Sequence, residues 1–201
     1  MAPWGQDILK AGKSMGIGGF GCVVADTVVH FQKVNKTSVK INNTDAFSNI
    51  NIKYENWNTA IDSLDLEASL TIYPEDRFTK VVLSPSKETK GICTGIVKMK
   101  EIPLDKKEGQ KWGYIATYGA QTLVSDTDLL GMAVFYKIAE LAEKKEGNYD
   151  HLLVFKPSAT AITYYFLGAW EQELDGIKNK EDFMADLNKK LDHLQANDVM
   201  P

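Results

Sequence analysis

The sequence predicts a mainly β protein, an antiparallel β-sandwich that ends in a C-terminal α-helix. Segments that alternate apolar and polar residues succeed one another from residue 21 to residue 99 with no helical periodicity between them. That order favours a sandwich over βαβ units. Residues 159–171 are rich in β-branched and aromatic side chains at both alternating positions, which is typical of a strand covered on both faces. Asn179 then precedes apolar residues at helical spacing, so a helix closes the chain.

The first half of the chain is predicted to consist almost entirely of strands. Residues 4–14 are expected to form a loose turn or a short helix. Asp26 and Thr27 mark the tip of a hairpin, and Pro74 ends the most regular alternation in the sequence. The predicted strands are residues 23–24, 28–31, 37–41, 47–57, 61–73, 78–83 and 91–99.

The second half is predicted to add more strands and the closing helix. Residues 100–111 are strongly charged, and we expect a surface loop there. An irregular or helical piece is expected after residue 137, and the last two strands are expected to pair as a hairpin around Pro157. Asn179 is the predicted N-cap of the helix, with Asp182 as its partner. The predicted strands are 112–123, 129–137, 151–156 and 159–170, and the predicted helix is 180–196.

One glycine-rich motif invites a functional interpretation. Residues 16–21 satisfy the GxGxxG pattern of dinucleotide-binding proteins and, with Val23, the kinase-like GxGxFGxV pattern. A dinucleotide site needs a strand before the glycines and a helix after them, but here the β-rich VVADTVVHF follows. The catalytic motifs of a protein kinase are also missing from the sequence. The motif is therefore expected to be a tight glycine turn leading into a strand, where another backbone approaches closely.

Composition excludes several function classes. The formal charge is −4, and Arg77 is the only arginine among 23 lysine and arginine residues, which argues against a nucleic-acid partner. No apolar run approaches the roughly 18 residues that a membrane span needs, so no membrane partner is expected, and the first residues lack the features of a signal peptide. Cys22 and Cys93 are expected to be buried hydrophobic residues, with a disulfide between them as the alternative. With three scattered histidines, no metal site and no cofactor are predicted.

Several residues are candidates for catalysis, each with a structural alternative. His30 and His151 are candidate general bases near neutral pH, although a histidine in a strand is more often structural. Paired carboxylates serve glycoside chemistry, and Asp7, Asp26, Glu171 and Glu173 are candidates by position alone. Tyrosine is also able to take a proton, which makes Tyr164 a further candidate.

Aromatic and cationic residues are candidates for binding a sugar. Aromatic faces stack on sugar rings, but aromatic side chains also dominate β cores, so core packing is the alternative for each of them. The candidate aromatics are Trp4, Trp57, Trp112, Tyr118, Tyr164 and Trp170. Lys10, Lys90, Lys156 and Arg77 are candidates for binding the carboxylate of an acidic sugar.

Five stretches together resemble one protein family. They are WGQDILKAGKSMGIGGFG, SNINIKYENW, SKETKGICTGIVK, GYIATYGAQTLVSDTDLLGMAV and YYFLGAWEQELDGIKNKEDF. They resemble the family called domain of unknown function 4861, secreted bacterial proteins found among polysaccharide-utilisation genes. The resemblance implies a super-sandwich similar to galactose mutarotase and a periplasmic or extracellular location. Family members are about twice as long, and the chain resembles their C-terminal half. One sandwich domain over residues 1–201 is therefore expected, with a fragment of a longer protein as the alternative.

The resemblance implies a protein that acts on or holds an acidic oligosaccharide. For an enzyme we expect a lyase or dehydratase type of elimination, in which a tyrosine or histidine takes a proton and a lysine or Arg77 offsets the developing charge. A mutarotase-like epimerase would need a histidine and a carboxylate on one sheet face. The alternative is a non-catalytic carbohydrate-binding module or an inactive remnant, and a titratable pair beside an aromatic in a concave face would favour an enzyme. Open sheet edges further predict a homo-oligomer.

Overall fold

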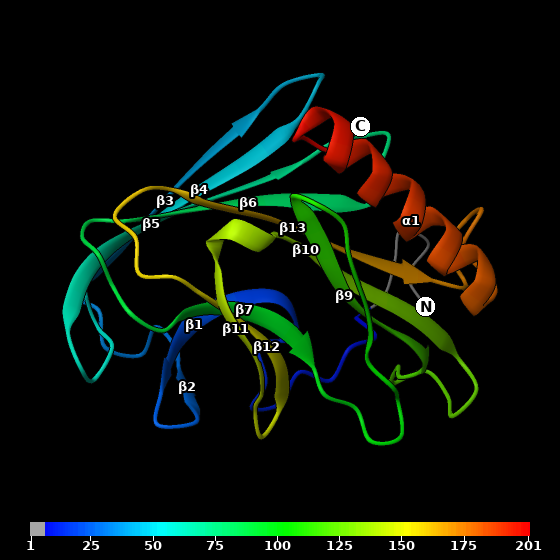
Figure 1. Ribbon diagram of the computed structural model, residues 1–201, viewed down its shortest axis with the longest axis horizontal. Helices are drawn as coiled ribbons and strands as arrows, with labels where there is room; N and C mark the ends of the chain where they lie inside the picture. Colours follow the sequence, from blue (N-terminus) through cyan, green and yellow to red (C-terminus); the bar gives the residue numbers. More distant parts are fainter. Residues whose placement is uncertain (1–6) are drawn as a thin grey trace.

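Two antiparallel sheets face each other in the computed structural model, which describes residues 7–201 (Figure 1). We call the eight-stranded sheet the large sheet and the five-stranded sheet the small sheet. In spatial order the large sheet contains β3 (Lys36–Asn43), β4 (Ser48–Asn58), β5 (Ser63–Ile72), β6 (Phe78–Pro85), β13 (Ile162–Trp170), β10 (Leu129–Lys137), β9 (Trp112–Ala120) and β8 (Asp105–Glu108). The small sheet contains β11 (Leu141–Glu146), β12 (Asp150–Phe155), β7 (Ile92–Val97), β1 (Ile17–Val24) and β2 (Thr27–Val29). The predicted antiparallel β-sandwich is confirmed.

Strand β13 lies in the middle of the large sheet and is buried on both faces. It pairs with β6 on one side and β10 on the other. Its residues alternate between two cores, as expected for a side-chain period of two. Ile162, Tyr164 and Trp170 belong to the core between the sheets, whereas Tyr165, Leu167 and Ala169 belong to the core beneath the helix. The prediction of a strand covered on both faces is confirmed.

The C-terminal helix α1 (Lys180–Asn197) covers the outer face of the large sheet over β9, β10 and β13 (Figure 1). Asn179 is its N-cap, as predicted, because its Oδ1 accepts the Asp182 N–H at 2.8 Å and its Nδ2 donates to Asp182 Oδ2 at 2.7 Å. The helix buries one apolar stripe on the sheet. The stripe consists of Phe183, Leu187, Leu191 and Leu194.

Two predictions for the second half of the chain are wrong. Residues 100–111 are not simply a surface loop, because they contain β8, which pairs with β9 at the edge of the large sheet. An edge strand that faces solvent needs no apolar alternation. The sequence DKKE of β8 therefore shows no pattern from which a strand is predicted. The hairpin around Pro157 is also wrong. Strand β12 belongs to the small sheet and β13 to the large one, so Pro157 lies on a crossover between the sheets.

The passage after residue 137 is helical only briefly. A single 3₁₀ turn, η1 (Ile138–Glu140), carries the chain from the large sheet to β11 in the small sheet. Residues 7–14 contain no helix, which leaves the loose turn as the correct alternative there. Trp4 lies outside the described residues.

The glycine motif lies within β1 rather than in a turn before it. A bulge interrupts the pairing of β1 with β7 between Ile17 and Phe20. Gly18 has φ +63°, and a Cβ placed there would lie 2.2 Å from the ring of Phe166 on β13. A Cβ at Gly19 would lie 2.4 Å from the Met15 carbonyl oxygen. The predicted close approach is confirmed, and the glycines serve packing between the sheets and not phosphate binding.

The β3–β4 hairpin extends beyond the small sheet and leaves apolar side chains uncovered. Val39, Ile41 and Ile50 continue the face that elsewhere forms the core. Ile50 pairs with Ile41 and with Leu70, and Leu70 packs against that core. Val39 is 59% exposed and Ile41 is 62% exposed. Among the described strands, β3 has no neighbour on its outer edge, so this corner of the sandwich carries an open edge and an apolar face.

Replacing Gly18 with alanine tests the contact between the sheets. We expect Gly18→Ala to lower the free energy of unfolding by roughly 2–4 kcal/mol, because the added methyl group overlaps the Phe166 ring and the backbone lies in the left-handed region. Gly168→Ala is the matched control, since a Cβ at Gly168 meets nothing within 4 Å. Urea unfolding of the two variants measures the difference. Equal stability of both variants would contradict the role assigned to Gly18.

Candidate active site

A cleft of about 510 Å³ lies on the outer face of the small sheet. Three segments distant in sequence form its walls: residues 12–14 before β1, the β1–β2 hairpin with the residues that follow it, and the turn from β11 into β12. Val28 and Leu152 belong to its lining and to the apolar cluster on this outer face. The cleft also contains Asp150 and His30, a carboxyl group and an imidazole from different strands.

Asp150 is the buried titratable group of the cleft. It is the first residue of β12 and is only 3% exposed. Its Oδ1 accepts the backbone N–H of Met15 at 2.9 Å. Burial raises the pKa of the Asp150 carboxyl, while the Met15 hydrogen bond and the nearby His30 and His151 oppose that shift. The protonated form of Asp150 is therefore favoured at higher pH than for a solvated aspartate.

His30 faces Asp150 from the other wall of the cleft. It follows β2 and is half-buried, and its backbone carbonyl accepts hydrogen bonds from Trp57 Nε1 at 3.3 Å and from Gln32 N–H at 2.9 Å. The backbone is fixed in this way, but within residues 7–201 the His30 ring has no hydrogen-bond partner. The charge of His30 acts on Asp150 although no hydrogen bond joins them.

Tyr149 and Lys13 complete the wall beside Asp150. Tyr149 is 48% exposed, and the Lys13 ammonium lies 5.8 Å from the centroid of its ring. An exposed aromatic ring offers a face for a sugar ring, and a lysine beside it attracts a carboxylate. Asp26 lies at the rim and is paired with Lys145. The cleft therefore brings together an aromatic, a cation, an imidazole and a carboxyl group with a raised pKa, a combination that suits proton transfer.

The sequence was compared with protein families, curated proteins and solved structures. The family model described as "Domain of unknown function (DUF4861)" matches residues 1–197. The chain belongs to the DUF4861 family. No curated protein matched the chain, and no solved structure matched it. The resemblance inferred from the sequence is thereby confirmed at the level of the family, and the function has to be argued from the site.

Two of the predicted catalytic residues of this DUF4861 protein lie in the core. His151 points between the sheets, is 6% exposed, and places its Nδ1 2.9 Å from Glu146 Oε1. Tyr164 is fully buried, and its hydroxyl donates to the Gly18 carbonyl at 2.7 Å. Burial raises the pKa of Tyr164 far above its ordinary value. Neither side chain lines a cleft, so we do not assign them a part in the chemistry.

The predicted sugar-binding aromatics are also packed inside the DUF4861 fold. Trp57 lies in the core between the sheets, and Trp112 and Tyr118 lie beneath α1. Trp112 Nε1 donates to Asp198 Oδ1 at 2.7 Å, and Trp170 Nε1 donates to Asp128 Oδ2 at 2.8 Å. Each has at most 8% of its surface exposed, so none offers a free face to a sugar.

The remaining predicted residues are dispersed over the surface. Glu171 accepts the Leu129 N–H at 2.7 Å, Arg77 pairs with Glu173 at 3.5 Å, and Lys90 is exposed before β7. Of the predicted candidates, His30 and Asp26 line the cleft, and Asp26 is paired with Lys145. The sequence reasoning missed Asp150, Tyr149 and Lys13. Asp150 and His151 are adjacent in the sequence at the start of β12. This pair of titratable residues was the signal that could have identified Asp150.

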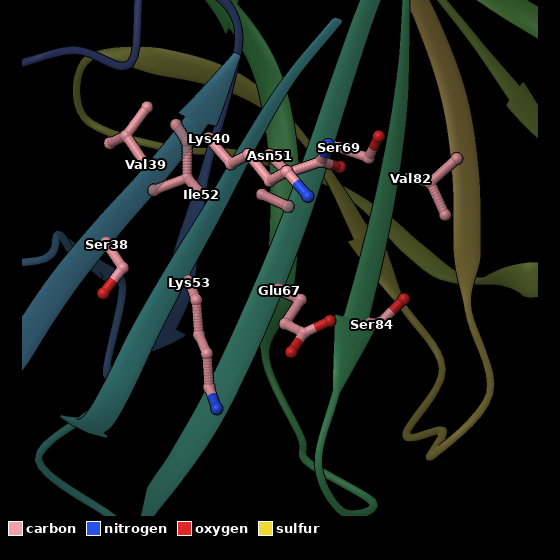
Figure 2. Close-up of a pocket in the computed structure, with 11 residues that line it drawn as sticks. Ser38, Val39, Lys40, Asn51, Ile52, Lys53, Glu67, Ser69, Val82 and Ser84 are labelled. Atoms are coloured by element: carbon pink, nitrogen blue, oxygen red, sulfur yellow. The ribbon is translucent and has the colours of Figure 1, made fainter. Parts of the chain in front are cut away.

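A second hollow, about 300 Å³ in volume, lies on the outer face of the large sheet over β3–β6 (Figure 2). Serine, asparagine and lysine residues of β3–β6 line it together with Glu67, and the lining also includes Val39, Ile52, Ala68 and Val82. It contains no histidine and no aromatic residue. In the described part of the chain no three histidine, cysteine or acidic side chains group as metal ligands, and no helix there is long and apolar enough to cross a membrane.

The buried carboxyl group of Asp150 predicts a stability effect. We expect Asp150→Asn to unfold at a higher temperature than the parent protein at neutral pH, because the amide carries no charge and its oxygen still accepts the Met15 N–H. A raised folded-state pKa contributes stability that is present below the ordinary Asp pKa and is lost as pH rises through the raised value. The difference in Tm should therefore widen across that pH window. Thermal unfolding at several pH values measures it, and a variant less stable than the parent at neutral pH would contradict the assignment.

Proposed function

We propose that this DUF4861 protein is a carbohydrate-active enzyme that acts on acidic oligosaccharides by elimination next to a uronate carboxylate. The observation that carries the proposal is the placement of His30 and Asp150 across one cleft without a hydrogen bond between them. Tyr149 and Lys13 in the same cleft supply a sugar-stacking face and a cation for the uronate. The family resemblance supports the substrate class, together with a periplasmic or extracellular location.

The proposed step uses one base and one acid. The His30 imidazole takes the proton from the sugar carbon next to the carboxylate. The electron pair of that C–H bond forms a carbon–carbon double bond, and the bond from the neighbouring carbon to its oxygen substituent breaks. The Asp150 carboxyl group gives its proton to that leaving oxygen. Lys13 offsets the negative charge that develops on the carboxylate.

Burial of Asp150 supports its part as the acid. A carboxyl group must hold its proton near neutral pH to protonate a leaving group, and burial shifts the Asp150 pKa in that direction. The half-buried His30 is accessible from the cleft, as a base that meets its substrate has to be. The same pair would also serve a mutarotase-like epimerase, in which the two groups exchange protons with the ring oxygen and the anomeric hydroxyl group.

Activity assays with variants test the proposal. We expect the parent protein to produce an ultraviolet-absorbing unsaturated uronate from uronate-containing oligosaccharides. His30→Gln and Asp150→Asn should each lower kcat/KM at least about 100-fold, the ordinary contribution of a general acid or base. His193→Gln on the outer helix α1 is the matched control and should retain activity.

Other outcomes distinguish the rival functions. Interconversion of sugar anomers without new absorbance would identify the epimerase. Thermal stabilisation by the oligosaccharides with no product would identify a non-catalytic binding module. If neither turnover nor stabilisation occurs with any acidic oligosaccharide, the proposed function is wrong and an inactive remnant becomes the better account.

We further propose that the chain self-associates through the corner formed by the β3–β4 hairpin. The open edge of β3 and the exposed Val39 and Ile41 favour pairing with a second copy. Light scattering of the purified protein should show a dimer or larger species, and Val39→Thr with Ile41→Thr should shift it towards the monomer. Ile61→Thr is the control, since Ile61 is 58% exposed outside the hairpin. A concentration-independent monomer would contradict this proposal.

A further inference from the structure

We infer that the hollow on the large sheet is a second binding site, which holds a strand of an acidic polysaccharide away from the cleft. We call this hollow the trough. It lies on the outer face of the large sheet, whereas the cleft lies on the outer face of the small sheet, so the two sites are on opposite sides of the sandwich. The choice of ligand rests on the proposed function; the existence of the site rests on its own geometry.

Strand register assembles the trough from side chains that share one face. Lys40 is opposite Asn51, and Asn51 is opposite Ser69. Lys53 is opposite Glu67 in the neighbouring row (Figure 2). Adjacent strands lie about 4.8 Å apart, so a row across three strands spans about 10 Å. The rows therefore present a surface of polar side chains large enough for more than one sugar unit.

A hydrogen-bond network holds the floor of this face. Asn49 Nδ2 donates to Ser69 Oγ at 2.8 Å and to Thr71 Oγ1 at 2.8 Å. Asn51 Nδ2 in turn donates to Asn49 Oδ1. Side chains that are already ordered lose less conformational entropy when a ligand binds. The amide and hydroxyl groups of the floor match the hydroxyl groups of a sugar chain, which both donate and accept hydrogen bonds.

The charge of the trough favours an anion. Lys40 and Lys53 line it, and Lys80 lies on the same outward face opposite Thr71. None of these lysines forms an ion pair with any residue from 7 to 201, whereas Lys144 and Lys145, for example, do. Glu67 is the one acidic residue in the lining. Unpaired lysines on one face of a chain with a net charge of −4 make a local site for negative charge.

The shape and chemistry favour a polysaccharide over a nucleic acid. The helix α1 leaves the outer face of β3–β5 uncovered (Figure 1), so a long chain has access. The lining has neither an aromatic residue nor an arginine, and single-stranded nucleic acids rely on aromatic stacking platforms. Lysine ammonium groups together with serine and asparagine suit carboxylate or sulfate groups on a hydroxyl-rich backbone.

Charge variants of the trough test the inference. The probe is polygalacturonate, with a neutral β-glucan and a single-stranded oligonucleotide for comparison, and binding is measured by calorimetry at low and at moderate salt. Lys40→Gln with Lys53→Gln should weaken polygalacturonate binding roughly five- to tenfold, and Glu67→Gln should strengthen it by about twofold. Lys100→Gln with Lys106→Gln removes the same charge from exposed positions elsewhere and should change binding less than twofold.

Each outcome decides between the inferences. Unchanged binding in the Lys40→Gln, Lys53→Gln variant would contradict binding of an acidic polysaccharide at the trough. Equally strong binding of the neutral glucan would contradict it as well. Tighter binding of the oligonucleotide than of polygalacturonate overturns the ligand class. Turnover of a short oligosaccharide in the cleft should be unaffected by the trough variant. If no oligosaccharide is turned over but polygalacturonate binding follows the trough variants, the proposed enzyme function fails while the second site remains.

Discussion

The contact between β13 and the start of β1 is the constraint on which the two sheets and the cleft depend. The Phe166 ring occupies the space where Gly18 has no side chain, and the Tyr164 hydroxyl donates to the Gly18 carbonyl at 2.7 Å. The bulge in β1 lies at the same place, between Ile17 and Phe20, and the backbone of Met15 lies against Gly19 within it. Met15 then donates its N–H to Asp150. Packing between the sheets thus positions the Met15 N–H that donates to Asp150, because a bulge changes the direction of the backbone beside it.

The core uses nearly all of the large aromatic side chains, which determines where ligands are able to bind. Both faces of β13 are buried, by the small sheet on one side and by α1 on the other. The cleft and the trough lie on two outer surfaces: the outer face of the small sheet, and the part of the large sheet that α1 leaves uncovered. The first has an apolar floor beneath Asp150 and His30. The second has lysine, serine and asparagine residues interspersed with a few apolar ones. The cleft on the first surface therefore suits proton transfer. The lysines on the second surface suit attraction of a negatively charged ligand.

Periodicity predicted most of the fold because alternation reports burial of one sheet face, and the strand at residues 129–137 was predicted with the bounds that β10 has. It failed at β8, whose side chains face solvent, and at Pro157, because short-range sequence does not show which sheet a strand joins. The site was predicted less well. His30 was identified as a candidate base, but its neighbour Asp150 is 120 positions away and meets it only through the pairing of β12, β7 and β1. Tryptophans chosen for sugar binding were instead used by the core.

Two buried aspartates show how the structure separates a structural carboxylate from a functional one. Asp128 is 2% exposed, and although burial would raise its pKa, hydrogen bonds from Thr122, Trp170 and Gln172 outweigh burial and lower it. Its charge is satisfied, so it stabilises the fold. Asp150 is buried to a similar extent, but from residues 7–201 its side chain accepts only the Met15 N–H, and its pKa is raised. Burial of a poorly satisfied carboxyl group costs stability. A second or third donor would have removed that cost and, with it, the proton that the proposed reaction needs, so the incomplete hydrogen bonding of Asp150 is itself an argument for its function.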